Sequence, residues 1–193
     1  NAAPYREVVT HGFVVTEDGR KMSKSLGNDI PPEQIIQQSG AEVLRLWVAM
    51  TDFREEIRIG KEILARVVEA YRKLRNTMRY LLANLYDFDP ARDLVAVADS
   101  VEVDRYALAR YAAVASRIRA AYEAYDFPAA FQALNAFATV DLSAFYFDVS
   151  KDRMYTFGAA SPERRSGQSA MYRIADGLVR LITPMLPVTA DEL

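Results

Sequence analysis

Residues 59–85 read IGKEILARVVEAYRKLRNTMRYLLANL and contain a long, regular pattern of apolar residues. These residues recur at steps of three and four, which places them on one side of an α-helix, at Ile63, Val67, Tyr71, Leu74, Met78, Leu81 and Leu85. The pattern predicts a helix of about 25 residues, roughly 37 Å long, with one face in a hydrophobic core. Asp89-Pro90 then breaks the helix.

The same predicted helix carries a run of basic residues. Arg72, Arg75 and Arg79 are three and four residues apart, so they share one face, and Asn76 lies within the run. Such a face can follow the phosphates of a nucleic acid, although a solvated basic face without a ligand is the commoner case. With 24 basic and 26 acidic residues the formal net charge is −2, so nucleic-acid contact would have to come from a local patch of this kind.

Further amphipathic segments lie on both sides of this helix. Two short helices are expected before it. The first starts around residues 31–33 and is ended by Ser39-Gly40, and the second runs from Ala41 to Met50. After it, we expect one helix with Asp104 as its N-cap, then a long helix or two in line that restart at residues 126–128, and a last helix beginning at Ser161 and Pro162. Four or five amphipathic helices with short loops predict a mainly α fold, an antiparallel helical bundle.

The first residues have a different pattern. Residues from Tyr5 to Val15 alternate β-branched and aromatic side chains and are followed by a turn at residues 17–19, which predicts a short strand or hairpin. A lone hairpin is only marginally stable in water, so we expect this piece to belong to a sheet that is missing here.

A loop rich in lysine and serine follows this strand. Residues 19–28 read GRKMSKSLGN, in which Lys21 and Lys24 alternate with Ser23 and Ser25 between two glycines. Ammonium groups, hydroxyls and free backbone N–H groups suit the oxygens of a polyphosphate. A solvated surface turn is the alternative interpretation of the composition alone.

The string Lys21-Met22-Ser23-Lys24-Ser25 resembles the KMSKS signature of the class I aminoacyl-tRNA synthetases. The strand before the string and the Leu-Gly-Asn after it fit the same family. The resemblance continues over almost the entire chain and is to the isoleucyl-tRNA synthetases in particular, through residues 41–47, 71–77, 84–90, 141–146 and 151–155.

The resemblance implies two domains. Residues 1–58 would be the C-terminal end of a nucleotide-binding catalytic domain, with the KMSKS loop and connecting helices, and residues 59–193 a helical-bundle anticodon-binding domain truncated at its C-terminal end. The intact enzyme activates isoleucine with ATP and transfers it to tRNA. We expect this fragment to be inactive alone, because it has no HIGH-like tetrapeptide, no nucleotide-binding parallel sheet and no editing domain.

The resemblance also implies roles for particular residues. Lys24, assisted by Lys21, would be catalytic by stabilising charge on the leaving pyrophosphate. ATP, accompanied by Mg²⁺ in the full enzyme, would be contacted by Lys21, Met22, Ser23, Lys24 and Ser25. Gly19 and Gly27 are candidate hinges for closure of the loop. The anticodon arm of tRNA would be contacted by Arg72, Arg75, Asn76 and Arg79, and no metal is expected in this fragment.

Two alternatives remain open. The first is the same region of a valyl-, leucyl- or methionyl-tRNA synthetase, against which residues 141–155 argue. The second is a helical interaction module with no enzymatic or RNA role, whose lysine loop is a coincidence. Only the synthetase interpretations predict RNA binding that weakens steeply with salt.

The resemblance implies a monomer whose partners are tRNA and the rest of a synthetase chain, and the remaining features indicate a cytoplasmic protein. The chain has no cysteine, which excludes disulfides, and we find neither a membrane-length apolar run nor a signal segment. Because it starts at Asn1-Ala2-Ala3, we interpret the first residues as a cloning remnant. His11 is a weak pocket candidate, Trp47 a packing anchor, and residues 148–153 a solvated charged face.

Overall fold

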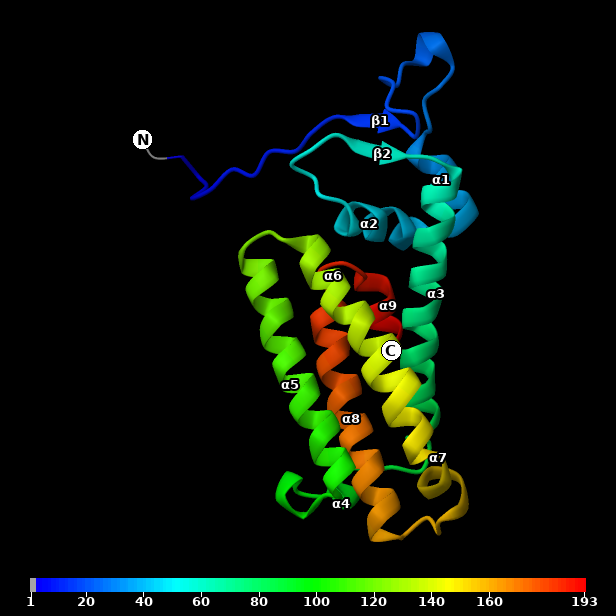
Figure 1. Cartoon of the computed structure of the whole chain (residues 1–193), viewed down its shortest axis with the longest axis vertical. Coiled ribbons are helices and arrows are strands. Elements are labelled where there is room, and N and C mark those ends of the chain that lie inside the picture. Colours follow the sequence, from blue (N-terminus) through cyan, green and yellow to red (C-terminus); the bar gives the residue numbers. More distant parts are fainter. Residues whose placement is uncertain (1–2) are drawn as a thin grey trace.

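The apolar stripe of residues 61–83 folds as α3 (Lys61–Ala83), which forms one side of a bundle of long helices. The computed structural model describes residues 3–193, so Asn1 and Ala2, which we interpret as part of a cloning remnant, lie outside the described residues. Successive long elements run in alternating directions (Figure 1): α3, α5 (Glu102–Glu123), a continuous helical segment over residues 127–156, and α8 (Pro162–Ile182). The predicted antiparallel, mainly α bundle is confirmed.

The segment over residues 127–156 contains a π-helix in its middle. It begins as α6 (Phe127–Ala136), continues as a ten-residue π-helix, η3 (Phe137–Tyr146), and ends as α7 (Phe147–Thr156). In a π-helix the backbone bonds span five residues instead of four, and the Ser143 hydroxyl likewise donates to the carbonyl of Ala138, five residues back. The prediction of a long helix or two in line is confirmed, and the π-helix is a feature that the sequence did not reveal.

Local sequence signals define several helix starts. Ser161 accepts a hydrogen bond from the backbone N–H of Arg164 and Pro162 occupies the first helical position of α8, as predicted. The carboxylate of Asp126 caps α6 in the same way, by accepting from the N–H of Ala129. The prediction that Asp104 caps a helix is wrong, because α5 begins at Glu102 and the Asp104 side chain is fully buried.

The core fills the centre of the bundle and extends upward to the small N-terminal layer. The largest side chains that are almost completely inaccessible come from four of the long elements and from the short helix α2, and are Leu46, Met78, Leu81, Ile118, Leu134, Phe137, Leu142, Tyr146, Met171, Ile174, Leu178 and Ile182. Burial of aliphatic and aromatic side chains on this scale supplies the main driving force for folding.

The N-terminal layer contains a two-stranded parallel sheet. Strand β1 (Val14–Thr16) pairs with β2 (Ile57–Ile59), with Val14 opposite Ile57. The strand is therefore shorter than the alternation over residues 5–15 predicts, and its partner follows about forty residues later in the chain. The predicted turn is present: Gly19 has a left-handed backbone (φ 81°), and the chain returns to form a bridge between Val15 and Lys21.

Helix α1 (Pro32–Ser39) lies between the proline start and the Ser39-Gly40 end that were predicted, α2 (Ala41–Met50) has its predicted bounds, and the two join the sheet to the bundle. In Figure 1, α2 lies across the end of the bundle, close to α6 and to the short C-terminal helix α9 (Pro187–Glu192). Four further short elements were not predicted, namely α9, α4 (Pro90–Asp93) and the 3₁₀ turns η1 (Lys24–Leu26) and η2 (Val97–Asp99).

A buried carboxylate ties three helices together at the far end of the bundle. Asp104 in α5 accepts hydrogen bonds from Arg153 in α7 (2.8 and 2.9 Å) and from the hydroxyl of Tyr146 (2.7 Å). Ser166 in α8 donates a further bond of 2.6 Å to the same carboxylate. The prediction that residues 148–153 are a solvated face is thus wrong for Arg153, whose partner lies 49 positions away, although the Lys151–Asp148 pair is exposed.

A second acid–arginine pair joins the chain after α3 to the start of α8. Asp87 accepts from both terminal nitrogens of Arg164 (2.6 and 3.0 Å) and from the amide of Gln168 (2.7 Å). The Arg164 guanidinium, followed by the Gln168 amide, lowers the pKa of Asp87 to about 2. Because the pKa is depressed in the folded state, the stabilisation is present at neutral pH and is lost as the pH falls from about 4 through 2.

Replacing Asp104 by Asn should lower the free energy of unfolding by about 3 kcal/mol, because Arg153, whose side chain is only 13% exposed, would lose its counter-charge. Urea denaturation followed by circular dichroism measures this change. The matched control is Asp99→Asn, which removes the same charge at an exposed position of η2. Equal urea midpoints for the two variants would refute a stabilising role for the Asp104 network.

Candidate functional site

The lysine and serine loop is closed at its base by Asn28. Its Oδ1 accepts from the backbone N–H of Ser23 (2.9 Å), while its Nδ2 donates to the carbonyl of Lys21 (3.2 Å). Gly27 ends η1 in the left-handed region (φ 61°), and its N–H donates to the carbonyl of Lys24. From the sequence, Asn28 was singled out only as part of the Leu-Gly-Asn resemblance, and its structural role was not predicted.

Side chains of the loop point in two directions. Lys21 and Lys24 are exposed, and within the described part of the chain neither has an acidic partner within 4.0 Å. The hydroxyls of Ser23 and Ser25 are 2.6 Å apart. Met22 is partly buried and packs against the core, so it anchors the loop from beneath. The loop thus presents two ammonium groups and two hydroxyls to solvent from a fixed base.

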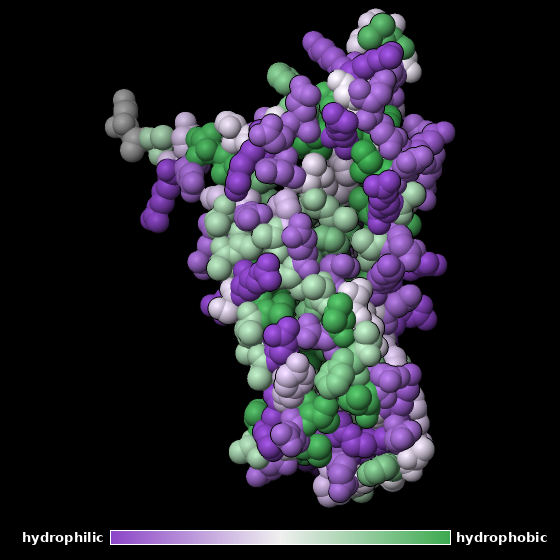
Figure 2. All heavy atoms as spheres, viewed as in Figure 1, coloured by the Kyte–Doolittle hydropathy of each residue, from purple (hydrophilic) through white to green (hydrophobic). Residues whose placement is uncertain are grey.

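The four residues predicted to contact tRNA come together around one hollow beside α3. Arg72, Arg75, Asn76 and Arg79 line a cavity of about 440 Å³, with the end of α1 on its other side at Gln38 and Ser39. Figure 2 shows hydrophilic side chains along the edge of the molecule that α3 forms. The predicted spacing on one helical face is therefore confirmed, whereas contact with RNA stays a prediction.

The cations around this hollow differ in their partners. Arg72 is paired with Glu69, one turn away, at 2.6 Å. Arg75 donates to the Tyr71 hydroxyl (3.0 Å) and lies 3.3 Å from Glu192 of α9. Arg79 is exposed and, among residues 3–193, has no acidic side chain within 4.0 Å. Arg79 is consequently the cation in this hollow that an incoming anion can reach without displacing an internal partner.

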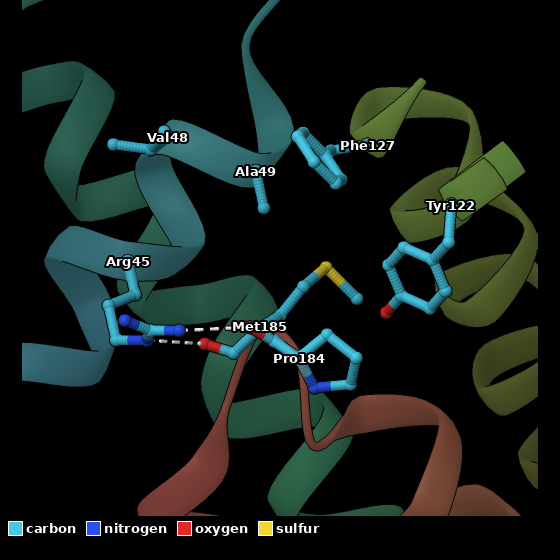
Figure 3. Close-up of a pocket in the computed structure, with 7 residues that line it drawn as sticks. All are labelled: Arg45, Val48, Ala49, Tyr122, Phe127, Pro184 and Met185. Carbon is cyan, nitrogen blue, oxygen red and sulfur yellow. Dashed lines mark hydrogen bonds between the residues drawn. The ribbon is translucent and has the colours of Figure 1, made fainter. Parts of the chain in front are cut away.

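Helix α2 connects the N-terminal layer to the bundle through two oppositely charged residues. Arg45 donates to the carbonyls of Met185 (3.0 Å) and Pro184 (2.9 Å), which follow the C-terminal end of α8 (Figure 3). One turn earlier, the Glu42 carboxylate accepts from the backbone N–H groups of Val188 (2.7 Å) and Thr189 in the first turn of α9. Each charge faces the helix end of opposite partial charge.

Glu42 also begins a chain of hydrogen bonds that reaches the basic hollow. It is 7% exposed and accepts from the hydroxyl of Tyr71 (3.2 Å) as well as from the hydroxyl of Thr189. Tyr71 in turn accepts from Arg75. A buried carboxylate in α2 thus sets the position of an arginine on α3.

Two apolar hollows lie where the N-terminal layer meets the bundle. One, of about 240 Å³, is lined by Arg45, Val48, Tyr122 and neighbouring residues, and the Met185 side chain reaches into it from the α8–α9 turn (Figure 3). The other, of about 300 Å³, is lined by His11 together with the buried ring of Trp47. Trp47 packs there and donates to the carbonyl of Arg58 (3.1 Å), so the predicted packing role is confirmed.

Two family models match the chain at the regions just described. One, tRNA synthetases class I (I, L, M and V), matches residues 1–60, and the other, the anticodon-binding domain of tRNA ligase, matches residues 104–193. The chain belongs to the class I aminoacyl-tRNA synthetases. The first match contains the KMSKS loop of this synthetase segment, and the second contains three of the four long elements of the bundle.

Curated relatives of this synthetase segment are isoleucine–tRNA ligases. The chain is 53% identical over 190 residues to the enzyme of Syntrophotalea carbinolica and 54% identical over 190 residues to that of Geobacter sulfurreducens. Each alignment covers 98% of this chain and 20% of the relative, so the chain spans about a fifth of the length of these relatives. The prediction of isoleucyl-tRNA synthetase similarity is confirmed, and the valyl, leucyl, methionyl and interaction-module alternatives are not favoured.

Solved structures agree on the fold. A ternary complex of Agrobacterium radiobacter LeuRS with tRNA and LeuAMS superposes with a TM-score of 0.71 at 20% identity, covering 94% of this chain and 21% of that chain. Mycobacterium tuberculosis methionyl-tRNA synthetase bound by methionyl-adenylate gives a TM-score of 0.73 at 20% identity, covering 94% and 36%. At this level of identity the likeness is one of architecture.

Two features are absent from the part of the chain that the structure describes. No helix in residues 3–193 is long and apolar enough to cross a membrane. Over the same residues, no three His, Cys, Asp or Glu side chains gather closely enough to hold a metal ion.

Replacing Asn28 by Ala should increase hydrogen exchange at the Ser23 amide, because that N–H loses its acceptor and the loop loses its closure at Lys21. Amide exchange measured by NMR tests this, with Asp29→Ala as a control at the neighbouring residue. If the Ser23 amide exchanged at the wild-type rate in both variants, the assignment of Asn28 as the residue that closes the loop would be wrong.

Proposed function

We propose that this chain is the part of an isoleucine–tRNA ligase that carries the ATP-contacting signature loop and a docking face for the anticodon arm of tRNA. The observation that carries the proposal is that one contiguous structure holds two basic sites. The first is an exposed loop whose two lysines have no acidic partner within 4.0 Å among residues 3–193, and the second is a hollow beside α3 that is lined by the four residues predicted to contact tRNA. Isoleucine–tRNA ligases that are 53–54% identical over this segment support the choice of amino acid.

The loop contributes electrostatic catalysis in the intact enzyme. ATP is the substrate, accompanied by Mg²⁺, and its condensation with isoleucine releases pyrophosphate. Lys24, assisted by Lys21, stabilises the negative charge that develops on the leaving pyrophosphate, and such stabilisation raises the rate because it acts in the transition state. Ser23 and Ser25 donate hydroxyls to phosphate oxygens, whereas Met22 keeps the loop seated on the core. Gly19 and Gly27 permit closure over the nucleotide.

The bundle contributes RNA binding. Arg72, Arg75, Asn76 and Arg79 contact the anticodon arm, with the arginines on phosphates and the amide available to a base or ribose. We propose the division into residues 1–58 and 59–193 on the basis of these roles. The boundary falls one residue before β2 ends at Ile59, and the helix that carries the RNA face begins at Lys61. The intact enzyme acts as a monomer in the cytoplasm.

Replacing Lys24 by Ala in the full-length enzyme should slow formation of isoleucyl-adenylate by about 100-fold or more, since one donor to developing charge is lost. Isoleucine-dependent ATP–pyrophosphate exchange measures this rate. Lys61→Ala, at an exposed lysine at the start of α3, is the control and should retain the wild-type rate. An unchanged rate in the Lys24 variant would remove the catalytic assignment.

Binding of an isoleucine anticodon stem-loop to this chain over a salt series tests the RNA role. We expect affinity to fall steeply with salt, and Arg79→Gln to reduce the slope of log K against log salt by about 0.7 to 0.9, the loss of one phosphate contact. Arg117→Gln, at an exposed arginine of α5, should leave the slope unchanged.

A stem-loop with a changed anticodon separates recognition from simple docking. Weaker binding of that hairpin would assign base recognition to this segment, and equal binding would assign recognition to other parts of the enzyme. No binding of either hairpin at low salt would refute the docking face.

A further inference from the structure

The RNA face contains an internal anionic group. Glu192, in the last turn of α9, places its Oε2 3.3 Å from Nη2 of Arg75, which lies 117 positions earlier in the chain. Both side chains are partly accessible, 43% for Arg75 and 53% for Glu192. The carboxylate therefore occupies one edge of a guanidinium that also borders the hollow proposed to receive RNA.

The other edge of Arg75 is held independently of Glu192. Nη1 donates to the hydroxyl of Tyr71 (3.0 Å), and the guanidinium carbon lies 5.7 Å from the centre of the Tyr71 ring. Tyr71 is itself fixed by Glu42 and by the hydroxyl of Thr189, 2.8 Å away. Arg75 can consequently keep its position when the Nη2 edge changes partner.

The chemistry of the two anions favours such an exchange. An exposed ion pair contributes little to stability, so releasing Glu192 into water costs little. A phosphate diester offers two acceptor oxygens and a full negative charge to the same guanidinium edge, a geometry that arginine matches better than lysine does.

We propose that Glu192 is an internal competitor for the RNA phosphate at Arg75, so that RNA binding exchanges a carboxylate for a phosphate on a guanidinium that Tyr71 holds in place. This inference rests on the proposed docking of RNA at α3. Glu192, which is paired with an arginine that lines the hollow, is thereby assigned as an element that weakens RNA binding, whereas Arg79 strengthens it.

The test compares two variants that remove one negative charge at adjacent positions. Glu192→Gln removes the competitor, and Asp191→Asn changes the net charge equally at an exposed residue that is not paired with Arg75. Measured with the isoleucine anticodon stem-loop, Glu192→Gln should tighten binding about threefold more than Asp191→Asn does. In an Arg75→Gln background the extra gain should disappear, because there is no guanidinium left to compete for.

The outcomes separate this inference from the proposed function. If the unaltered chain binds the stem-loop but the two variants are indistinguishable, or Glu192→Gln weakens binding, competition is refuted and the docking face stands. A gain that persists in the Arg75→Gln background would also refute competition, because the effect would then be one of general charge. If the unaltered chain does not bind RNA at low salt, both proposals fall.

Discussion

Two charged residues one turn apart on α2 determine how the halves of this structure are arranged. Arg45 binds the carbonyls that follow α8, and Glu42 binds the N–H groups that begin α9, so a single short helix satisfies both sides of the α8–α9 turn. Backbone groups at helix ends have no partner within their own helix, and leaving them buried and unsatisfied is costly. The pairing of each charge with its helix end fixes the direction in which α2 crosses the bundle.

The functional geometry depends on that crossing. Helix α1 follows the signature loop and α2 follows α1, so the place where α2 docks sets where the loop stands relative to α3. The same Glu42 carboxylate positions Tyr71 and, through it, Arg75. The proposed nucleotide site and the proposed RNA site are thereby held at a defined separation through one buried acidic group. Its removal would leave several donors without an acceptor in the interior.

Sequence reasoning predicted the parts that depend on local pattern. Apolar periodicity predicted α2 and the extent of α3, while proline, glycine and serine signals predicted the ends of α1 and the start of α8 after its N-cap Ser161. Periodicity and capping are properties of neighbouring residues. The KMSKS string and the arginine spacing gave the candidate residues of both sites, and the structure brings the arginines to one hollow. Roles in catalysis and RNA binding remain predictions for both groups.

What the sequence could not supply depends on distant partners. The strand at residues 14–16 finds its parallel neighbour beyond two helices, Arg153 finds Asp104 from 49 positions away, and Glu42 meets α9 across 146 or 147 positions. An aspartate three residues into a helix matches an N-cap as well as it matches a buried anchor, so only the tertiary fold distinguishes the two. Asn28 directly follows a glycine, and this local signal could have been used to propose that Asn28 closes the loop.

The wide turn of η3 has a geometric consequence for the helix that continues from it. A turn closed by bonds over five residues holds more residues than an α-turn, so every side chain beyond it is rotated about the helix axis relative to an unbroken α-helix. The buried residues of this segment are Phe137, Ala138, Leu142 and Tyr146. The π-helix therefore acts as a phase shift, which sets the angle at which Tyr146 and Arg153 leave the helix to meet the single carboxylate of Asp104.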